Sequence, residues 1–403
     1  MIDRETAAEL MVRLTNWWNA TAVWDCGMAF TVGPVFEESY EIRAAIIAGK
    51  TVSLGRARDV AHSFCDRAVL NQGLVEPNMY TMGYGGNRDD NGTPNCSCVA
   101  DACSSAMALV DTINAYPDSA RREDYVVSLR KFVDYVLDTY RDEEGVIGVG
   151  ILGHQINPMP KYWCANSLFI EVLIGLADIT GEQSYYDTAV PILDFLARYQ
   201  YEKVEWGIWD SCAPEVILYA GEGLMAGLDS DAMSQRLGVH RVTGPRYSPP
   251  DSDNGSVTGD ALNRQKAEEQ PASFGAEDNT LAAVLKLRMD EFIDWLHRHQ
   301  EPRGTWQVPK DSRCYTAGLS WLLQWYMRRF GPSRKVEEMI ARHIMHMDSP
   351  EAKTFEGLFA EAFGSALAHF SAASVVEYLS LADADEVYCS VTDASTRWAS
   401  ELW

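Results

Sequence analysis

The sequence contains no run of about 18 apolar residues, so no transmembrane helix is expected. Basic residues are also few: 34 lysines and arginines stand against 58 aspartates and glutamates, which gives a formal net charge of −24. Nucleic acids and anionic membrane surfaces are bound by clustered lysine and arginine, so neither is an expected partner. The segment from Met1 to Glu5 lacks the basic start of a secretory signal. We therefore expect a cytoplasmic protein, unless a signal has been removed.

Metal ligands and nucleotide-binding motifs are equally scarce. The nine cysteines are an odd number for a disulfide framework, and buried free thiols are the simpler interpretation. Cys96, Cys98 and Cys103 lie close together in the sequence, but no histidine is near and their spacing fits no common zinc motif. The loop from Gly83 to Gly86 lacks the Lys-Ser/Thr pair of a phosphate-binding loop. No metal and no cofactor are therefore expected.

A recurring unit is the most informative feature that is present. Gly207-Ile208-Trp209-Asp210 leads into the small-residue helix 213–228, and Gly304-Thr305-Trp306-Gln307 leads into a similar segment at 314–326. A glycine follows the tryptophan at the same offset in both copies, and a looser third copy begins at Glu144. Repetition at this scale predicts an array of helical hairpins, none of which buries its apolar face alone.

Helical periodicity dominates the whole chain, and small-residue segments alternate with charged amphipathic ones. The predicted helices are Thr6 to Thr21, Ser53 to Leu70, Cys98 to Tyr116, Arg122 to Tyr140, Cys164 to Thr180, Ser184 to Tyr201, Ala213 to Leu228, Asn279 to Gln300, Cys314 to Phe330, Arg334 to Met347, Leu358 to Ser380 and Asp393 to Glu401. This alternation fits two concentric rings of helices, in which the crowded inner helices favour small residues and the outer helices expose one charged face. We therefore predict an all-α (α/α)6 toroid, a six-hairpin barrel, as a single domain over 1–403 with an irregular insertion near 243–271.

Three segments resemble a known superfamily: 165–168, 176–181 and 185–189. A helix that ends in Thr-Gly, as at Thr180-Gly181, and a following helix that starts Tyr-x-x-x-Ala, as at Tyr185, are common among six-hairpin glycosidases. The chain is most similar to the branch with unsaturated glucuronyl hydrolases, related uronidases and barrel-type polysaccharide lyases, over roughly residues 50 to 380. One departure is clear. Where the glucuronyl hydrolases carry an aspartate ahead of the asparagine-containing inner helix, this chain has Tyr162-Trp163-Cys164.

In such a barrel the loops at the N-terminal ends of the inner helices form the pocket, and carboxylates there are the first catalytic candidates. Asp210 and Glu215 would supply an acid–base pair for glycoside hydrolysis, although a helix cap and a first-turn acid explain them equally well. Asp89 lies in a polar loop that also fits a solvated turn. Glu222 lies inside a small-residue helix, where burial would raise the pKa of its carboxyl group, unless an ion pair holds it charged.

Aromatic and basic side chains complete the candidate site. Trp209 and Trp306 would present flat faces to a sugar, and the alternative is that both fill hairpin junctions as part of the core. Arg88 and Arg313 would clamp a sugar carboxylate. The other predicted substrate-binding residues are Asp90, Trp163, Asn166 and Glu356.

The predicted function is hydrolysis of a uronic-acid-containing oligosaccharide by carboxylate acid–base catalysis, in carbohydrate metabolism or polysaccharide degradation. The partner is then the oligosaccharide substrate. Two alternatives stay open at this point. The first is an oligosaccharide or polysaccharide lyase in which His154 abstracts a proton and Tyr162 acts as the acid. The second is a helical-repeat binding protein without catalytic activity.

Overall fold

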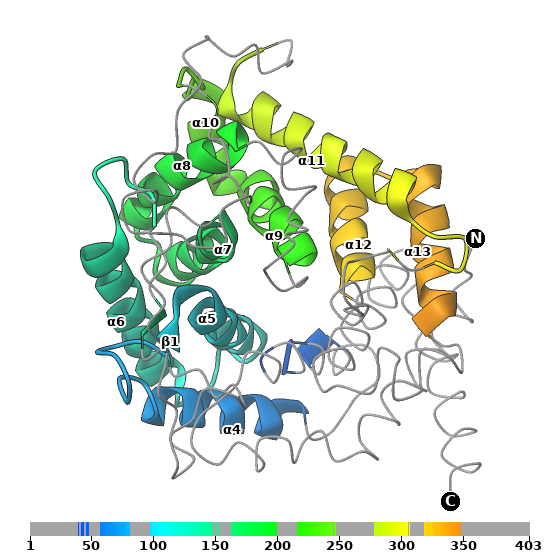
Figure 1. The fold of residues 1–403 in the computed structure, drawn as a ribbon. Helices are drawn as coiled ribbons and strands as arrows, with labels where there is room; N and C mark the ends of the chain where they lie inside the picture. The colour runs from blue at the N-terminus through cyan, green and yellow to red at the C-terminus, as the bar shows by residue number, and fades with distance from the viewer. Residues whose placement is uncertain are drawn as a thin grey trace, which may run out of the picture. The chain divides into compact units, whose positions relative to one another are not determined.

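The computed structural model describes residues 39, 42–43, 46–47, 57–80, 97–147, 151–152, 163–199, 216–244, 246, 278–304, 306 and 318–347. These residues are mostly helical (Figure 1). The helices are α4 (Ala57–Leu70), α5 (Val99–Ala115), α6 (Arg122–Tyr140), α7 (Trp163–Thr180), α8 (Gln183–Arg198), α9 (Val216–Asp229), α10 (Asp231–Val239), α11 (Leu281–His299), α12 (Leu319–Phe330) and α13 (Arg334–Met347). Two short strands, β1 (Ser97–Cys98) and β2 (Ile151–Leu152), pair antiparallel.

The chain divides into two compact units. One comprises residues 68–295, and the other comprises residues 1–67 together with 296–403. A single domain over 1–403 stays a prediction. Among the described residues, none of the helices combines the length and the apolar character that a bilayer crossing requires.

The unit of residues 68–295 contains three consecutive helix pairs, α5/α6, α7/α8 and α9/α10, together with most of α11. Helix α7 packs against both α5 and α9, and it also contacts α8 and α6. Within this unit Figure 1 shows α6 and α8 as a second row beside α5 and α7. The sequence pattern explains the two rows. Helix α7 is buried over most of its length, whereas α6 buries one face, from Tyr125 to Val136, and exposes charged residues on the other.

Small residues let the helices of the first row approach closely. A Cβ atom on Gly175 of α7 would collide with Val110 of α5, and one on Gly223 of α9 would collide with Ser167 of α7. Gly227 meets Leu193 of α8 in the same way. The glycine and serine content of these helices therefore reflects close packing between neighbouring hairpins.

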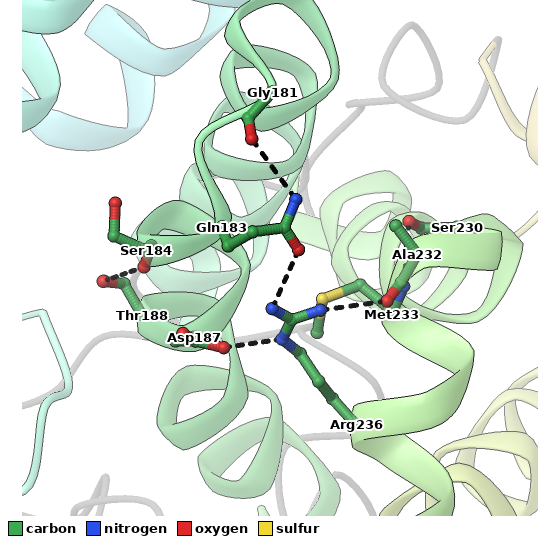
Figure 2. Close-up of polar contacts among 9 residues, drawn as sticks. All are labelled: Gly181, Gln183, Ser184, Asp187, Thr188, Ser230, Ala232, Met233 and Arg236. Carbon is green, nitrogen blue, oxygen red and sulfur yellow. Dashed lines mark hydrogen bonds and ion pairs between the residues drawn. The ribbon is translucent and has the colours of Figure 1, made fainter.

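Helix α10 is the main difference from the sequence prediction, which contained no helix over Asp231–Val239. Ser230 begins it by accepting a hydrogen bond from the backbone N–H of Met233 at 3.3 Å. Arg236 then ties it to α8, since its guanidinium donates to Asp187 at 2.6 Å and to Gln183 at 3.2 Å (Figure 2). Only Met233 and Leu237 are buried in α10. A helix with two buried residues leaves too little periodicity to be predicted.

The other predicted helices that the structure describes are present, and some of them begin or end at other residues than predicted. Helices α6 and α13 have the predicted bounds, while α12 begins at Leu319, later than the predicted Cys314. The predicted helices at Thr6 to Thr21, Leu358 to Ser380 and Asp393 to Glu401 lie outside the described residues, as does most of the insertion near 243–271.

Candidate active site

Most of the predicted site lies outside the described residues. This holds for the catalytic candidates Asp89, His154, Tyr162, Asp210 and Glu215, and for the binding candidates Arg88, Asp90, Trp209, Arg313 and Glu356. Trp163 is described only as the first residue of α7. Three predicted residues are described in full: Glu222, Asn166 and Trp306.

Glu222 lies on α9 at the point where α9 and α7 touch. Its side chain is fully buried. Beside it, the backbone N–H of Gly223 donates to Ser167 Oγ at 2.9 Å, and the same hydroxyl donates to the carbonyl oxygen of Tyr219. An α-helix normally joins the N–H of residue 223 directly to the carbonyl of residue 219. The Ser167 hydroxyl thus enters the α9 hydrogen-bond ladder next to Glu222, a kind of insertion that bends helices locally.

Ser167 is the residue of this arrangement that sequence reasoning missed. It lies in the segment 165–168, which supports the resemblance of fold but carries no predicted role for Ser167. Its small polar side chain in a largely apolar helix is the signal that the sequence offers. The partner that gives it a role, α9, lies more than 50 residues further along the chain.

Asn166 does not have the role predicted for it. Its side chain is fully buried, its carbonyl oxygen accepts from the N–H of Ile147 at 2.9 Å, and its amide donates to the carbonyl of Ile147 at 2.8 Å. The side-chain amide of Asn166 thus pairs with Ile147 as one backbone amide pairs with another between strands. Both backbone groups of Ile147, which is buried, are satisfied in this way. Asn166 therefore fastens the turn after α6 to α7, and its assignment to substrate binding is corrected to a structural role.

Trp306 is also corrected. It is 0% exposed, and its indole N–H donates to the carbonyl of Leu296 at 2.7 Å. The ring meets the imidazole of His343 edge to face, with centroids 4.9 Å apart. A sugar stacks on an exposed aromatic face, so Trp306 has the alternative role that the sequence left open, as a core side chain at a hairpin junction.

His343, which Trp306 contacts, also forms a buried hydrogen bond with a serine. Ser320 of α12 and His343 Nδ1 of α13 are 2.7 Å apart, and both side chains are fully buried. Burial, together with the smaller effect of the nearby His346, lowers the pKa of His343 to about 3. At neutral pH the imidazole is therefore uncharged, and the pair holds α12 against α13.

The His343 side chain is expected to make the protein less stable in acid. Between pH 6.5, its ordinary pKa, and about 3, its pKa in the folded state, the unfolded chain binds one more proton at this residue. The free energy of unfolding should then fall by roughly 1 kcal/mol for each pH unit below 6.5. Urea unfolding at about pH 7, 6 and 5 measures this slope. The variant H343Q should be less stable than the wild type at neutral pH, and its free energy of unfolding should depend less on pH. An equally steep pH dependence in H343Q and the wild type would contradict the role given to His343.

Among the described residues, no group of three or more histidine, cysteine, aspartate or glutamate side chains is arranged to hold a metal ion. Of the predicted catalytic residues, only Glu222 is described. Its carboxyl group is buried on α9, and the Ser167 hydroxyl bonds to the backbone of α9 beside it.

Comparisons with known proteins concern the fold. No protein-family model matches the sequence, and no curated protein does. Among solved structures, a glycosyl hydrolase family 88 protein from Bacteroides vulgatus is 10% identical, with a TM-score of 0.55 over 94% of this chain and 100% of that chain.

Two further structures are similar to the same extent. A polysaccharide lyase is 10% identical, with a TM-score of 0.53 over 93% of this chain and 98% of the other. A possible member of the GH105 family from Salmonella enterica serovar Paratyphi A is also 10% identical, with a TM-score of 0.53 over 85% of this chain and 82% of the other.

These likenesses define the class of fold. The chain shares its mostly helical fold with these glycosyl hydrolase and polysaccharide lyase structures. The predicted all-α fold of this class is thereby confirmed, and closure of the hairpins into a toroid stays a prediction.

Proposed function

We propose that this protein is a glycoside hydrolase that acts on a uronic-acid-containing oligosaccharide. The observation that carries the proposal is the likeness of fold, over nearly the whole chain, to structures titled as glycosyl hydrolase family 88 and GH105. One fold hosts many chemistries, so the site must supply the reaction. Glu222, a carboxyl group buried on α9, is the acid that we assign to this reaction, because glycoside hydrolysis needs a carboxylic acid at the bond that breaks.

In the proposed mechanism, substrate binding exposes Glu222, which is fully buried in the free protein, and its carboxylic acid protonates the glycosidic oxygen as the bond to the leaving sugar breaks. A second carboxylate, Asp210, Glu215 or Asp89, acts as base or nucleophile on the other face of the sugar. The separation of the two carboxyl groups decides whether the configuration at the anomeric carbon is retained or inverted. Ser167 keeps α9 in place at Glu222 through its bonds to Gly223 and Tyr219.

The experiment replaces Glu222 by glutamine, which keeps the shape and removes the acid. On a disaccharide with a uronic acid, E222Q is expected to lower kcat by about a hundredfold or more. The matched control is E143Q, which removes an exposed carboxylate after α6. An activated phenol leaves without protonation, so an aryl glucuronide of this kind should restore most of the lost rate. Equal losses on both substrates, or no loss at all, would contradict the role of general acid.

A second candidate is a lyase, favoured by the similar structure that is titled a polysaccharide lyase. Here His154 would remove the proton beside the uronate carboxylate and Tyr162 would protonate the leaving oxygen. Elimination creates a carbon–carbon double bond that absorbs in the ultraviolet, and hydrolysis does not. Incubation with polygalacturonate, followed by absorbance and by reducing-end formation, separates the two. Reducing ends without absorbance indicate a hydrolase, and both signals together indicate a lyase.

A further inference from the structure

The turn between α12 and α13 concentrates positive charge. Helix α12 ends at Phe330, the three residues Gly331-Pro332-Ser333 form the turn, and α13 begins at Arg334. Four basic side chains flank this turn and are exposed: Arg328, Arg329, Arg334 and Lys335. The segment 328–335 with these side chains is called the α12–α13 corner below.

The charge of the corner is opposite to that of the protein. The chain has 34 lysines and arginines in 403 residues and a net charge of −24. In the corner, four of eight residues are basic and none is acidic. The nearest acids along the chain are Glu337 and Glu338, and Glu338 pairs with Arg334 at 2.9 Å on the surface. A cluster of positive charge attracts anions, whereas the acidic remainder of the protein repels them.

Helix electrostatics explain only half of this pattern. Arg328 and Arg329 lie at the C-terminal end of α12, where cations are favourable. Arg334 and Lys335 lie at the N-terminal end of α13, where cations are unfavourable and acids are preferred. The first-turn N–H groups of α13 add to the attraction for an anion. Arg334 is offset by its pair with Glu338 one turn further along α13, so the observation that carries the site is the cluster of four exposed cations as a whole.

An aromatic side chain lies among these cations. Phe330 is 36% exposed, and its ring packs on that of Tyr326 with centroids 5.0 Å apart. The face of a sugar ring stacks on exposed aromatic groups, while its carboxylate binds guanidinium groups. We propose that the α12–α13 corner binds a carboxylate-bearing sugar chain, as a surface site for the polymeric form of the substrate. This inference rests on the proposed function for the class of sugar.

The test removes three charges and keeps Arg334, so that its pair with Glu338 at the start of α13 stays intact. The variant is R328Q/R329Q/K335Q. The control, R121Q/K131Q/R141Q, removes three exposed basic residues from the other unit and changes the net charge equally. Binding of a fluorescein-labelled oligogalacturonate is followed by anisotropy. The corner variant should bind about tenfold more weakly, as expected for three exposed charges, and the control should bind as the wild type does.

Two further measurements separate the outcomes. F330S should weaken binding without changing its salt dependence, whereas the triple variant should make the salt dependence shallower. Equal weakening by both triple variants would overturn the site, and so would competition by duplex DNA as strong as that by unlabelled oligogalacturonate, since the corner would then bind any polyanion.

Turnover of an aryl glucuronide by the wild-type protein decides the proposed function separately. Loss of binding in the corner variant without any turnover in the wild type supports the site and contradicts the proposed function. Turnover with undiminished binding in the corner variant contradicts the site alone.

Discussion

Replacement of Gly304 by alanine is expected to lower the free energy of unfolding by about 4 kcal/mol or more, which is a large part of the stability of an ordinary domain. Gly304 has a φ of +98°, and a Cβ atom there would overlap the carbonyl group of Arg342 and lie 3.0 Å from the N of His343. The backbone of α13 would have to move. Gln300, which donates to the carbonyls of Gly304 at 3.1 Å and Met339 at 2.9 Å, would lose its position as well.

The control for this prediction is Gly331, whose φ is +94° but whose Cβ position has no atom within 4 Å. G331A carries the conformational cost alone and should lower the free energy of unfolding by roughly 1–3 kcal/mol, since a φ of 94° with a ψ of 170° is a conformation that essentially only glycine adopts. Urea unfolding of G304A, G331A and the wild type measures both values. Equal losses in the two variants would mean that the approach of Gly304 to α13 contributes nothing.

The second large effect is expected at Gly223, where alanine should destabilise the protein by about 3 kcal/mol although alanine normally favours a helix. The added Cβ would lie 2.6 Å from both the Cα and the carbonyl oxygen of Ser167. These are backbone atoms, so α9 and α7 must separate. The bridge from Ser167 Oγ to Gly223 and Tyr219 would then break.

Gly238 provides the matched control, because it lies in a helix, α10, and its Cβ position is open. G238A should therefore stabilise the protein by about 0.5–1 kcal/mol, the ordinary gain from replacing glycine in a helix. Thermal and urea unfolding of both variants test the opposite signs. A gain in stability for G223A would show that α7 and α9 are not in close contact there.

The same pair of variants bears on the proposed reaction, since Gly223 directly follows Glu222. G223A should also reduce turnover, because displacement of α9 moves the Glu222 carboxyl group, and a shift of about 1 Å at a catalytic group costs on the order of a hundredfold in rate. G238A should leave turnover unchanged. This comparison is made at a temperature where both variants are folded, as judged by circular dichroism.

The helices are the part of this fold that the sequence determined by itself. Helix α6 has the predicted bounds because apolar residues recur at three and four along 122–140 and Glu123 and Asp124 favour its first turn. Helix α13 has its predicted bounds because apolar residues recur at the same spacing, although Arg334 and Lys335 are unfavourable in its first turn. These signals lie within one segment and need no partner from elsewhere. Helix α10 was not predicted because only Met233 and Leu237 of it are buried, and its contacts with Asp187 and Gln183 of α8 are visible only in the tertiary structure.

The roles of single side chains were decided by the tertiary structure. The sequence identified Glu222 as an acid in a small-residue helix, the structure shows that it is buried, and its catalytic role stays a prediction. The sequence also proposed Asn166 and Trp306 as binding residues, and both turned out to be structural, held by Ile147 and by Leu296. Burial and hydrogen bonding depend on which distant segments meet, so the periodicity of one helix predicts that a side chain faces inward but not what it meets there.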